Sequence, residues 1–244
     1  MIKEAIEKIQ EMSKDEVISI GEEHYIIRDG IYTQIRPELD FADTEQLTSL
    51  EAVVFMIKTE LADKKFPPPL FVEVNAHDEV CVFSEPMDEY RATRLAPYDA
   101  KATGVPGWAA ETRMGFDEAM IALRTRFQAT ADIDYALKLL NDLTTGSKVT
   151  FNDNGVATSV VTKTGVALQS NQTIRPIIKL KPYRTFQEVE QPESEFCIRI
   201  NEREIRFIEA DGGMWKLKAR QNVKAWLEER LADEIKNKLV IVML

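Results

Sequence analysis

The residues with the most chemical potential lie in one stretch of the sequence, from Leu180 to Phe196. Its carboxylates are Glu188, Glu190, Glu193 and Glu195. Clustered carboxylate oxygens are the ligands that hard divalent cations prefer, and Asp211 follows closely in the chain. Glu190 and Asp211 are therefore weak metal candidates, compatible with a metal-dependent nuclease. The chain shows no convincing acidic-x-Lys arrangement for such a nuclease, so the favoured alternative is an acidic strand edge in water.

The same stretch and the residues just before it are also rich in cations. Arg175, Lys179, Lys181 and Arg184 fall within ten residues. On an extended strand the first three would share one face, and Tyr183 and Phe186 could stack on a ring. The sequence therefore predicts that Tyr183, Arg184, Lys181 and Arg175 bind an anionic or aromatic ligand. The alternative is a set of ordinary surface cations beside a packed tyrosine.

Other catalytic or metal-binding patterns are weak. The two histidines, His24 and His77, lie in or beside expected hairpins, and His77-Asp78 is more typical of a turn than of a catalytic pair. Cys81 and Cys197 lie in alternating apolar runs and form no CxxC pair, which favours reduced, buried thiols over a zinc site. We expect no cofactor and no catalytic residue.

A second short motif, Asp211-Gly212-Gly213, comes directly before an expected helix. Glycine-rich turns at a helix start can hold a phosphate group. Two glycines behind an aspartate are a poor match, so we expect a tight strand-to-helix turn instead. Trp215 and Trp226 are expected to be core or interface aromatics.

Composition limits the classes of function. The 244 residues carry a formal net charge of −10, which makes bulk nucleic-acid binding unfavourable because that binding depends on many Lys and Arg contacts. The N-terminus lacks a secretory signal and no apolar run is long enough to span a membrane. We expect a cytoplasmic protein without membrane association. The chain length allows either one domain or two, 1–100 and 101–244.

The first half of the chain predicts a mixture of helices and hairpins. Residues 2–13 have helical apolar spacing, and strands are expected at 17–20, 24–28 and 31–35. A capping box from Thr48 to Glu51 predicts a helix to about Asp63. A hairpin should follow at 70–75 and 80–83. Residues 85–115, which are rich in proline and glycine, are expected to form a long irregular connection.

The second half predicts a helical pair and then more strands. Helices are expected at 116–127 and from a capping Asp132 to about 143. Strands are expected around Asn154-Gly155, at 174–180 and at 196–209, before a helix that carries residues 219–231. The apolar end, 239–244, suggests a buried strand or an interface. The predicted class is α+β, with mostly antiparallel sheets built from hairpins and four to five helices packed on them.

Two parts of the chain resemble known phage families. Lys179 to Phe196 reads Lys-Leu-Lys-Pro-Tyr-Arg-Thr-Phe-Gln-Glu-Val-Glu-Gln-Pro-Glu-Ser-Glu-Phe, and Glu-Ala-Asp-Gly-Gly-Met-Trp follows from Glu209. This resembles a group of uncharacterised bacteriophage and prophage proteins. The helix after Leu47-Thr48-Ser49-Leu50, the helix from Phe116-Asp117-Glu118 and the later β region follow an order similar to that of prophage proteins of the YfdQ type. The resemblance implies a phage-encoded accessory protein of the host cytoplasm and no assigned activity.

Together these patterns favour a non-enzymatic phage accessory protein, expected to be a homo-oligomer. Its expected partner is a host protein or a small nucleotide-like ligand that it sequesters. One alternative is an accessory factor of phage DNA replication or recombination, and another is the metal-dependent nuclease. Leu180 to Phe196 is expected to act first as a structural junction that leads into the hairpin at 196–209.

Overall fold

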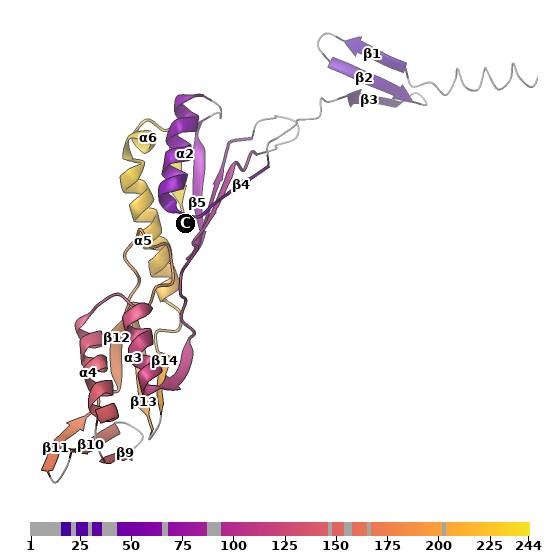
Figure 1. Ribbon diagram of the computed structural model, residues 1–244. Helices are drawn as coiled ribbons and strands as arrows, with labels where there is room; N and C mark the ends of the chain where they lie inside the picture. Colours follow the sequence, from indigo (N-terminus) through magenta and orange to yellow (C-terminus); the bar gives the residue numbers. More distant parts are fainter. Residues whose placement is uncertain are drawn as a thin grey trace, which may run out of the picture. The chain divides into compact units, whose positions relative to one another are not determined.

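A computed structural model describes ten ranges of the chain: residues 16–20, 23–28, 31–35, 43–64, 68–86, 94–145, 148–153, 158–164, 167–201 and 204–244. The chain divides into two compact units, residues 1–42 and 43–244. Within the described ranges there are five helices and four sheets, of which three are wholly antiparallel (Figure 1). The predicted α+β class is confirmed.

The first unit contains one small antiparallel sheet. Its strands are β1 (Glu16–Ile20), β2 (Glu23–Arg28) and β3 (Ile31–Ile35), in the order β1-β2-β3. The three predicted strands are confirmed. The predicted helix at 2–13 lies outside the described residues.

The second unit contains a five-stranded sheet of order β15-β5-β6-β7-β4. Its strands are β4 (Glu45–Leu47), β5 (Leu70–Ala76), β6 (Glu79–Phe83), β7 (Tyr98–Lys101) and β15 (Val240–Met243). The predicted hairpin of β5 and β6 is confirmed. The apolar chain end is confirmed as a strand whose Val240 and Val242 are buried. Both edge strands pair in parallel, β15 with β5 and β4 with β7, which local hairpin signals did not predict.

Three helices accompany this sheet: α2 (Leu50–Ala62), α5 (Trp215–Arg230) and α6 (Ala232–Lys236). Leu50 and Val53 of α2 and Val223 and Leu227 of α5 are buried in the same core as the inner strand residues. The predicted end of α2 is confirmed, but the predicted cap is wrong. Ser49, not Thr48, accepts the hydrogen bond from Ala52 N, at 3.2 Å.

A four-stranded antiparallel sheet of order β12-β13-β14-β8 forms the second core. Its strands are β8 (Glu111–Gly115), β12 (Ile177–Leu180), β13 (Ser194–Ile200) and β14 (Glu204–Glu209). Helices α3 (Phe116–Thr125) and α4 (Ala131–Thr145) pack on one face of it (Figure 1). The predicted helices and the hairpin of β13 and β14 are confirmed.

Two local predictions in this region are wrong. The stretch 85–115 is not wholly irregular, since it contains β7 and β8, both of which hydrogen-bond to strands from elsewhere in the chain. Helix α4 is capped by Thr130, whose Oγ1 lies 3.3 Å from Ile133 N. Asp132 instead accepts a hydrogen bond from the backbone N–H of Lys179 at 2.8 Å, a contact that depends on the tertiary fold.

A further antiparallel sheet comprises β9 (Lys148–Asp153), β10 (Thr158–Thr164) and β11 (Ala167–Thr173). The pairing of β9 with β10 confirms the expected hairpin there. The Asn154-Gly155 turn itself lies outside the described residues.

Residues 181–193, called here the connecting segment, join the two cores. Leu180 and Phe196, on either side of the segment, are buried in the core of the four-stranded sheet. Phe186 and Val189, inside it, are buried in the core of the five-stranded sheet. That second core contains residues from both sides of the predicted domain boundary at 100 and 101, and the division at this point stays a prediction.

Candidate functional site

The centre of the candidate site is the guanidinium of Arg184, which the connecting segment holds between the two cores. Arg184 is only 4% exposed. Its Nη1 donates a hydrogen bond to Glu209 Oε1 at the end of β14. Burial lowers the pKa of Arg184, and the hydrogen bond to Glu209 opposes that effect. An arginine keeps its proton in proteins even so, and the site therefore contains a buried positive charge.

Most of the remaining surroundings of Arg184 are aromatic. Its guanidinium carbon lies 4.4 Å from the centre of the Trp215 ring and 5.4 Å from that of Phe196. Nε and Nη2 have no hydrogen-bond partner within the described residues. Buried donors without partners are uncommon because each costs about 1–3 kcal/mol of desolvation.

The backbone around Arg184 is fixed by one buried amide side chain, that of Gln191. Its Oε1 accepts hydrogen bonds from the backbone N–H groups of Arg184 and Thr185, at 2.9 and 3.2 Å. Its Nε2 donates to the carbonyl groups of Phe186 and Val189, at 2.9 and 3.3 Å. Gln191 thus satisfies both ends of an irregular turn inside the protein. Arg184 is held by a rigid support rather than by a free loop.

The start of α5 lies next to Arg184. Gly212 and Gly213 have φ values of 63° and 81°, which favour glycine, and Asp211 Oδ1 accepts a hydrogen bond from Gly213 N at 3.0 Å. The expected tight turn is confirmed. No side chain caps the start of α5, and its first turn contains no acidic residue. The positive end of the helix dipole therefore has no acidic side chain of its own first turn to balance it.

A cavity of about 390 Å³ opens where these groups meet. Its walls come from the β5–β6 turn, the loop before β8, the connecting segment and the start of α5. The polar and aromatic lining residues are His77, Asp78, Trp108, Arg184, Trp215 and Lys216. Ligand pockets typically measure about 300–1,000 Å³, so this cavity has room for a small molecule.

His77 and Trp108 form the aromatic walls of this cavity. The His77 ring meets the Trp215 ring edge to face at 4.8 Å. Burial lowers the pKa of His77, as do Lys216 and Arg184, while Asp78 and Glu79 raise it. The indole N–H of Trp108 is buried without a hydrogen-bond partner in the described part of the chain. The cavity thus combines one imidazole, two indoles, two cations and the carboxylate of Asp78.

The predicted ligand residues do not all reach this cavity. Only Arg184 lines it. Tyr183 is half-buried, and its backbone N–H bonds to Arg126 O at 2.9 Å. Lys181 pairs with Glu190. Arg175 lies 3.2 Å from Asp132 Oδ1 and 4.7 Å from the Tyr135 ring centre. The binding role predicted for these four residues stays a prediction, but the structure separates Arg175 and Lys181 from Arg184.

The carboxylates of the connecting segment have structural contacts. Glu188 Oε1 accepts a hydrogen bond from Leu50 N, at 2.9 Å, and so caps α2 from a distant part of the sequence. Glu190 is exposed, and its hydrogen bond with Lys181 lowers its pKa. Within the described residues, no cluster of three or more acidic, histidine or cysteine side chains is arranged to hold a metal ion. Glu190 and Asp211 stay weak candidates.

The cysteines are free and half-buried. Burial raises the pKa of Cys81 to about 12, and the hydrogen bond with Asp99 acts in the same direction. A thiol with so high a pKa stays protonated at neutral pH. Cys81 is therefore a poor nucleophile.

Trp108, Lys216 and His77 were not predicted to belong to a common site. They lie far apart in the sequence, and no local spacing connects them. Trp108 follows Pro106-Gly107 in an expected loop, and a single aromatic residue in a loop is a weak signal by itself. The packing of α5 against the β5–β6 hairpin brings Lys216 and His77 together, through contacts such as Arg220 Nε to Val74 O at 2.9 Å. Trp108 is held separately, by ring contacts with Phe127 and Phe207.

No protein-family model matches the chain, and the curated proteins and the solved structures give no match either. The fold and the cavity define the class: an α+β protein with a small-molecule-sized cavity between two cores. In the described part of the chain, no helix is both long and apolar enough to cross a membrane.

Proposed function

We propose that this protein is a non-enzymatic binding protein that takes a small anionic, nucleotide-like ligand in the cavity at Arg184. The observation that carries the proposal is the buried guanidinium of Arg184, whose Nε and Nη2 have no hydrogen-bond partner in the described residues. A phosphate or carboxylate group would supply the two acceptors that a guanidinium fork matches. Movement of a surrounding side chain would admit the ligand to these atoms.

The electrostatics of the cavity support an anionic ligand. Lys216 lies on its wall, and the uncapped start of α5 adds the positive end of a helix dipole. Backbone N–H groups at a helix start and a nearby cation together favour a phosphate group. Glu209 neutralises part of the Arg184 charge, but it occupies only Nη1.

The aromatic walls support a ligand that also carries a ring. Trp108 and Trp215 both line the cavity, and indole rings pack well against flat heterocycles. The buried N–H of Trp108 offers a hydrogen bond to a ring acceptor. Inorganic phosphate would satisfy only the cationic part of the cavity, whereas a nucleotide would satisfy both parts.

Titration calorimetry with adenosine monophosphate and with inorganic phosphate tests this proposal. Lys216→Gln should weaken the binding of both ligands by about tenfold, because a hydrogen bond to a charged group contributes roughly 1.5–3 kcal/mol. Lys218→Gln is the matched control, since Lys218 is exposed on the same helix but does not line this cavity. The proposal fails if the unaltered protein binds neither ligand, or if both variants weaken binding equally.

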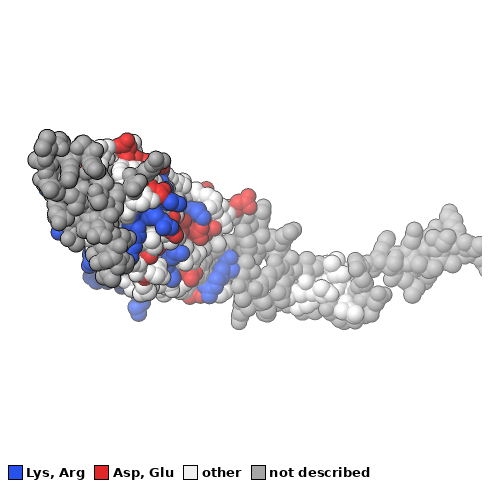
Figure 2. Space-filling view, turned by 90° about the horizontal axis from the view of Figure 1, so that it is seen from below, with Lys and Arg blue, Asp and Glu red and all other residues white. Residues whose placement is uncertain are grey.

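The wider biological setting also stays a proposal. It includes the phage origin, a location in the host cytoplasm, a host protein partner and a homo-oligomer. The alternatives of a DNA replication or recombination factor and of a nuclease are likewise untested. On the described surface that Figure 2 shows, basic and acidic residues are interspersed, an arrangement that offers an extended phosphate backbone few uninterrupted contacts.

A further inference from the structure

Three arginines lie directly opposite one another on adjacent strands of the four-stranded sheet. The register pairs Arg199 of β13 with Arg206 of β14, and Arg206 with Arg113 of β8. All three point to the face away from α3 and α4, because their strand neighbours Ile198, Ile205 and Met114 are buried in the core. These residues are called here the arginine row.

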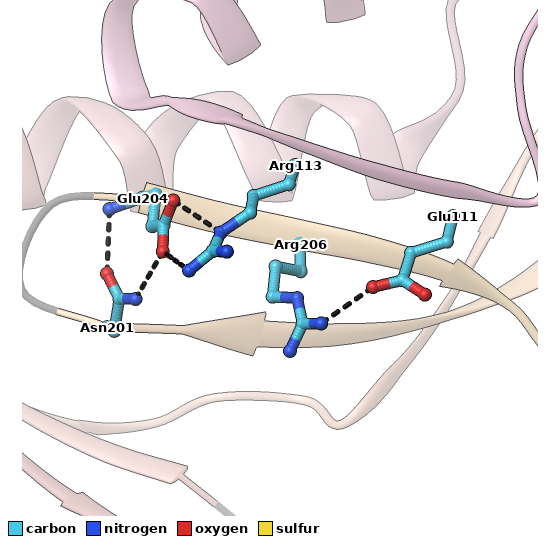
Figure 3. A network of polar contacts seen from close by, with 5 residues as sticks. All are labelled: Glu111, Arg113, Asn201, Glu204 and Arg206. Atoms are coloured by element: carbon cyan, nitrogen blue, oxygen red, sulfur yellow. Dashed lines mark hydrogen bonds and ion pairs between the residues drawn. The ribbon is translucent and has the colours of Figure 1, made fainter.

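Like charges in directly opposite positions destabilise a sheet, and two carboxylates offset part of this cost. Arg113 binds Glu204 through Nε and Nη2, and Arg206 Nη2 lies 2.7 Å from Glu111 Oε1 (Figure 3). Asn201 Nδ2 holds Glu204 in place at 2.7 Å. These contacts show that carboxylates on this face can reach two of the three arginines.

The row nevertheless keeps unused donors. Arg199 is half-buried in the middle of the sheet, and no described residue forms a hydrogen bond or ion pair with its side chain. The Nε of Arg206 is buried and also has no hydrogen-bond partner within the described residues. The two neighbouring arginines thus have donors that one further carboxylate could accept from.

A second row, parallel to the first, is apolar. The register aligns Ile177 with Cys197 and Cys197 with Ile208. This row lies two residues along the strands from the arginine row, or about 7 Å. Ile177 is 47% exposed, although it is a large apolar side chain. Ile208 in turn lies opposite Glu111. The outer face therefore presents, beside the arginine row, a row of three apolar residues that ends at a carboxylate.

We propose that this outer face binds an acidic peptide segment of a partner protein, in which carboxylates alternate with apolar side chains. An extended peptide sends successive side chains to opposite sides. A segment that crosses the strands between the two rows can place its carboxylates on Arg199 and Arg206 and its apolar side chains on Ile177 and Ile208. Recognition of acidic motifs by arginine clusters is a common mode of peptide binding.

The composition of this face favours a peptide over a nucleic acid. The outward residues described on the four strands include no aromatic side chain, since Phe196 and Phe207 face the core. Single-stranded nucleic acids are bound largely by stacking of bases on aromatic rings. The apolar row suits aliphatic side chains, which a nucleic acid does not carry.

The test measures fluorescence anisotropy of a labelled short peptide that alternates glutamate and valine. Arg199→Gln should raise the dissociation constant about tenfold, because it removes a charged hydrogen bond. Arg124→Gln, which makes the same charge change on the exposed side of α3, should leave it unchanged. Glu111→Gln should tighten binding about two- to fivefold, because it releases Arg206 from an exposed ion pair.

The Glu111→Gln variant keeps the proposal falsifiable if Arg199→Gln impairs folding, which a thermal unfolding scan would detect. Equal binding of a peptide with glutamine in place of each glutamate would overturn the proposal. So would equal effects of Arg199→Gln and Arg124→Gln, or unchanged binding in Glu111→Gln. A single-stranded oligonucleotide that binds more tightly than the peptide, with loss in Arg199→Gln, would assign the face to nucleic acid instead.

Discussion

The protein contains the same ion pair, arginine with glutamate, in two contrasting environments. Arg184 and Glu209 are buried at the junction of the two cores, with side-chain exposures of 2% and 9%. Arg113 and Glu204 lie on the open face of the four-stranded sheet, with exposures of 58% and 25%. Burial lowers the pKa of Arg184, whereas the hydrogen bond with Glu204 raises that of Arg113.

If both proposals hold, one chemical group would serve two kinds of binding. A guanidinium out of water has lost its hydration, and an unused donor there binds a matching anion strongly. A guanidinium in water exchanges partners at small cost, because solvent and salt screen each pair. The buried arginine suits a small ligand held in one geometry. The arginine row suits an exchangeable peptide.

The largest expected effect is that of Arg184→Met. The substitution leaves the Glu209 carboxylate buried without its partner, and breaking a buried pair in this way costs about 3–5 kcal/mol. The free energy of unfolding in urea measures the loss. A loss below about 1 kcal/mol would show that the pair behaves like an exposed one, and the contrast between the two environments would fail.

A double variant, Arg184→Met with Glu209→Gln, sharpens this result. It removes both charges, and neutral replacement of a buried pair is often tolerated. We expect the double variant to be more stable than Arg184→Met alone. If both lose the same stability, the cost lies in packing against Trp215 and Phe196 rather than in the unpaired charge.

An intermediate effect is expected from pH, through His77 beside Arg184. Its pKa in the folded protein lies below the usual 6.5, so the unfolded chain takes up a proton first as the pH falls. The contribution of His77 to stability is complete above about pH 6.5 and is lost as the pH falls from there towards the folded pKa.

Urea unfolding at several pH values between about 7.5 and 5.5 measures this loss. His77→Gln should make the loss of stability across that range smaller, because the variant has no proton to bind at this position. His24→Gln controls for removal of a histidine, since the chain contains only two. An unchanged pH dependence in His77→Gln would mean that the cavity does not disfavour a positive charge there.

The smallest expected effect is that of Arg113→Met. Its pair with Glu204 lies in water, so we expect a loss of stability much smaller than that of Arg184→Met. The loss should shrink further between low salt and about 1 M salt, where the screening length falls to about 3 Å. Thermal unfolding at both salt concentrations measures it. A large loss that salt does not reduce would place the two ion pairs in one class.

Local sequence patterns predicted much of the fold, because they depend on neighbouring residues. The β5–β6 and β13–β14 hairpins follow from alternating apolar residues around short turns. The end of α2 follows from its apolar spacing and from the prolines beyond it. The caps were not predictable in the same way. Glu188, in the connecting segment, caps α2 by accepting a hydrogen bond from Leu50 N. Asp132 accepts a hydrogen bond from the backbone N–H of Lys179 in β12 and does not cap its own helix.

Parallel pairing of the edge strands was also beyond a local argument. β15 pairs with β5 although about 160 residues separate them, and nothing in either segment selects a partner or a direction. Their long connection passes through most of the second unit. The apolar run at the chain end indicated a strand there, but it did not indicate where β15 lies in the sheet.

For the candidate site, the sequence determined which residues are present: a structural junction that contains Arg184, a tight turn at Asp211-Gly212-Gly213, and scattered tryptophans. The tertiary structure decided which of them meet. In the fold, the Arg184 guanidinium lies over the Trp215 ring. Arg175 and Lys181 pair instead with Asp132 and Glu190, and three arginines align across one sheet. Residue types follow from the sequence itself, whereas burial and cross-strand register arise only when distant segments pack together.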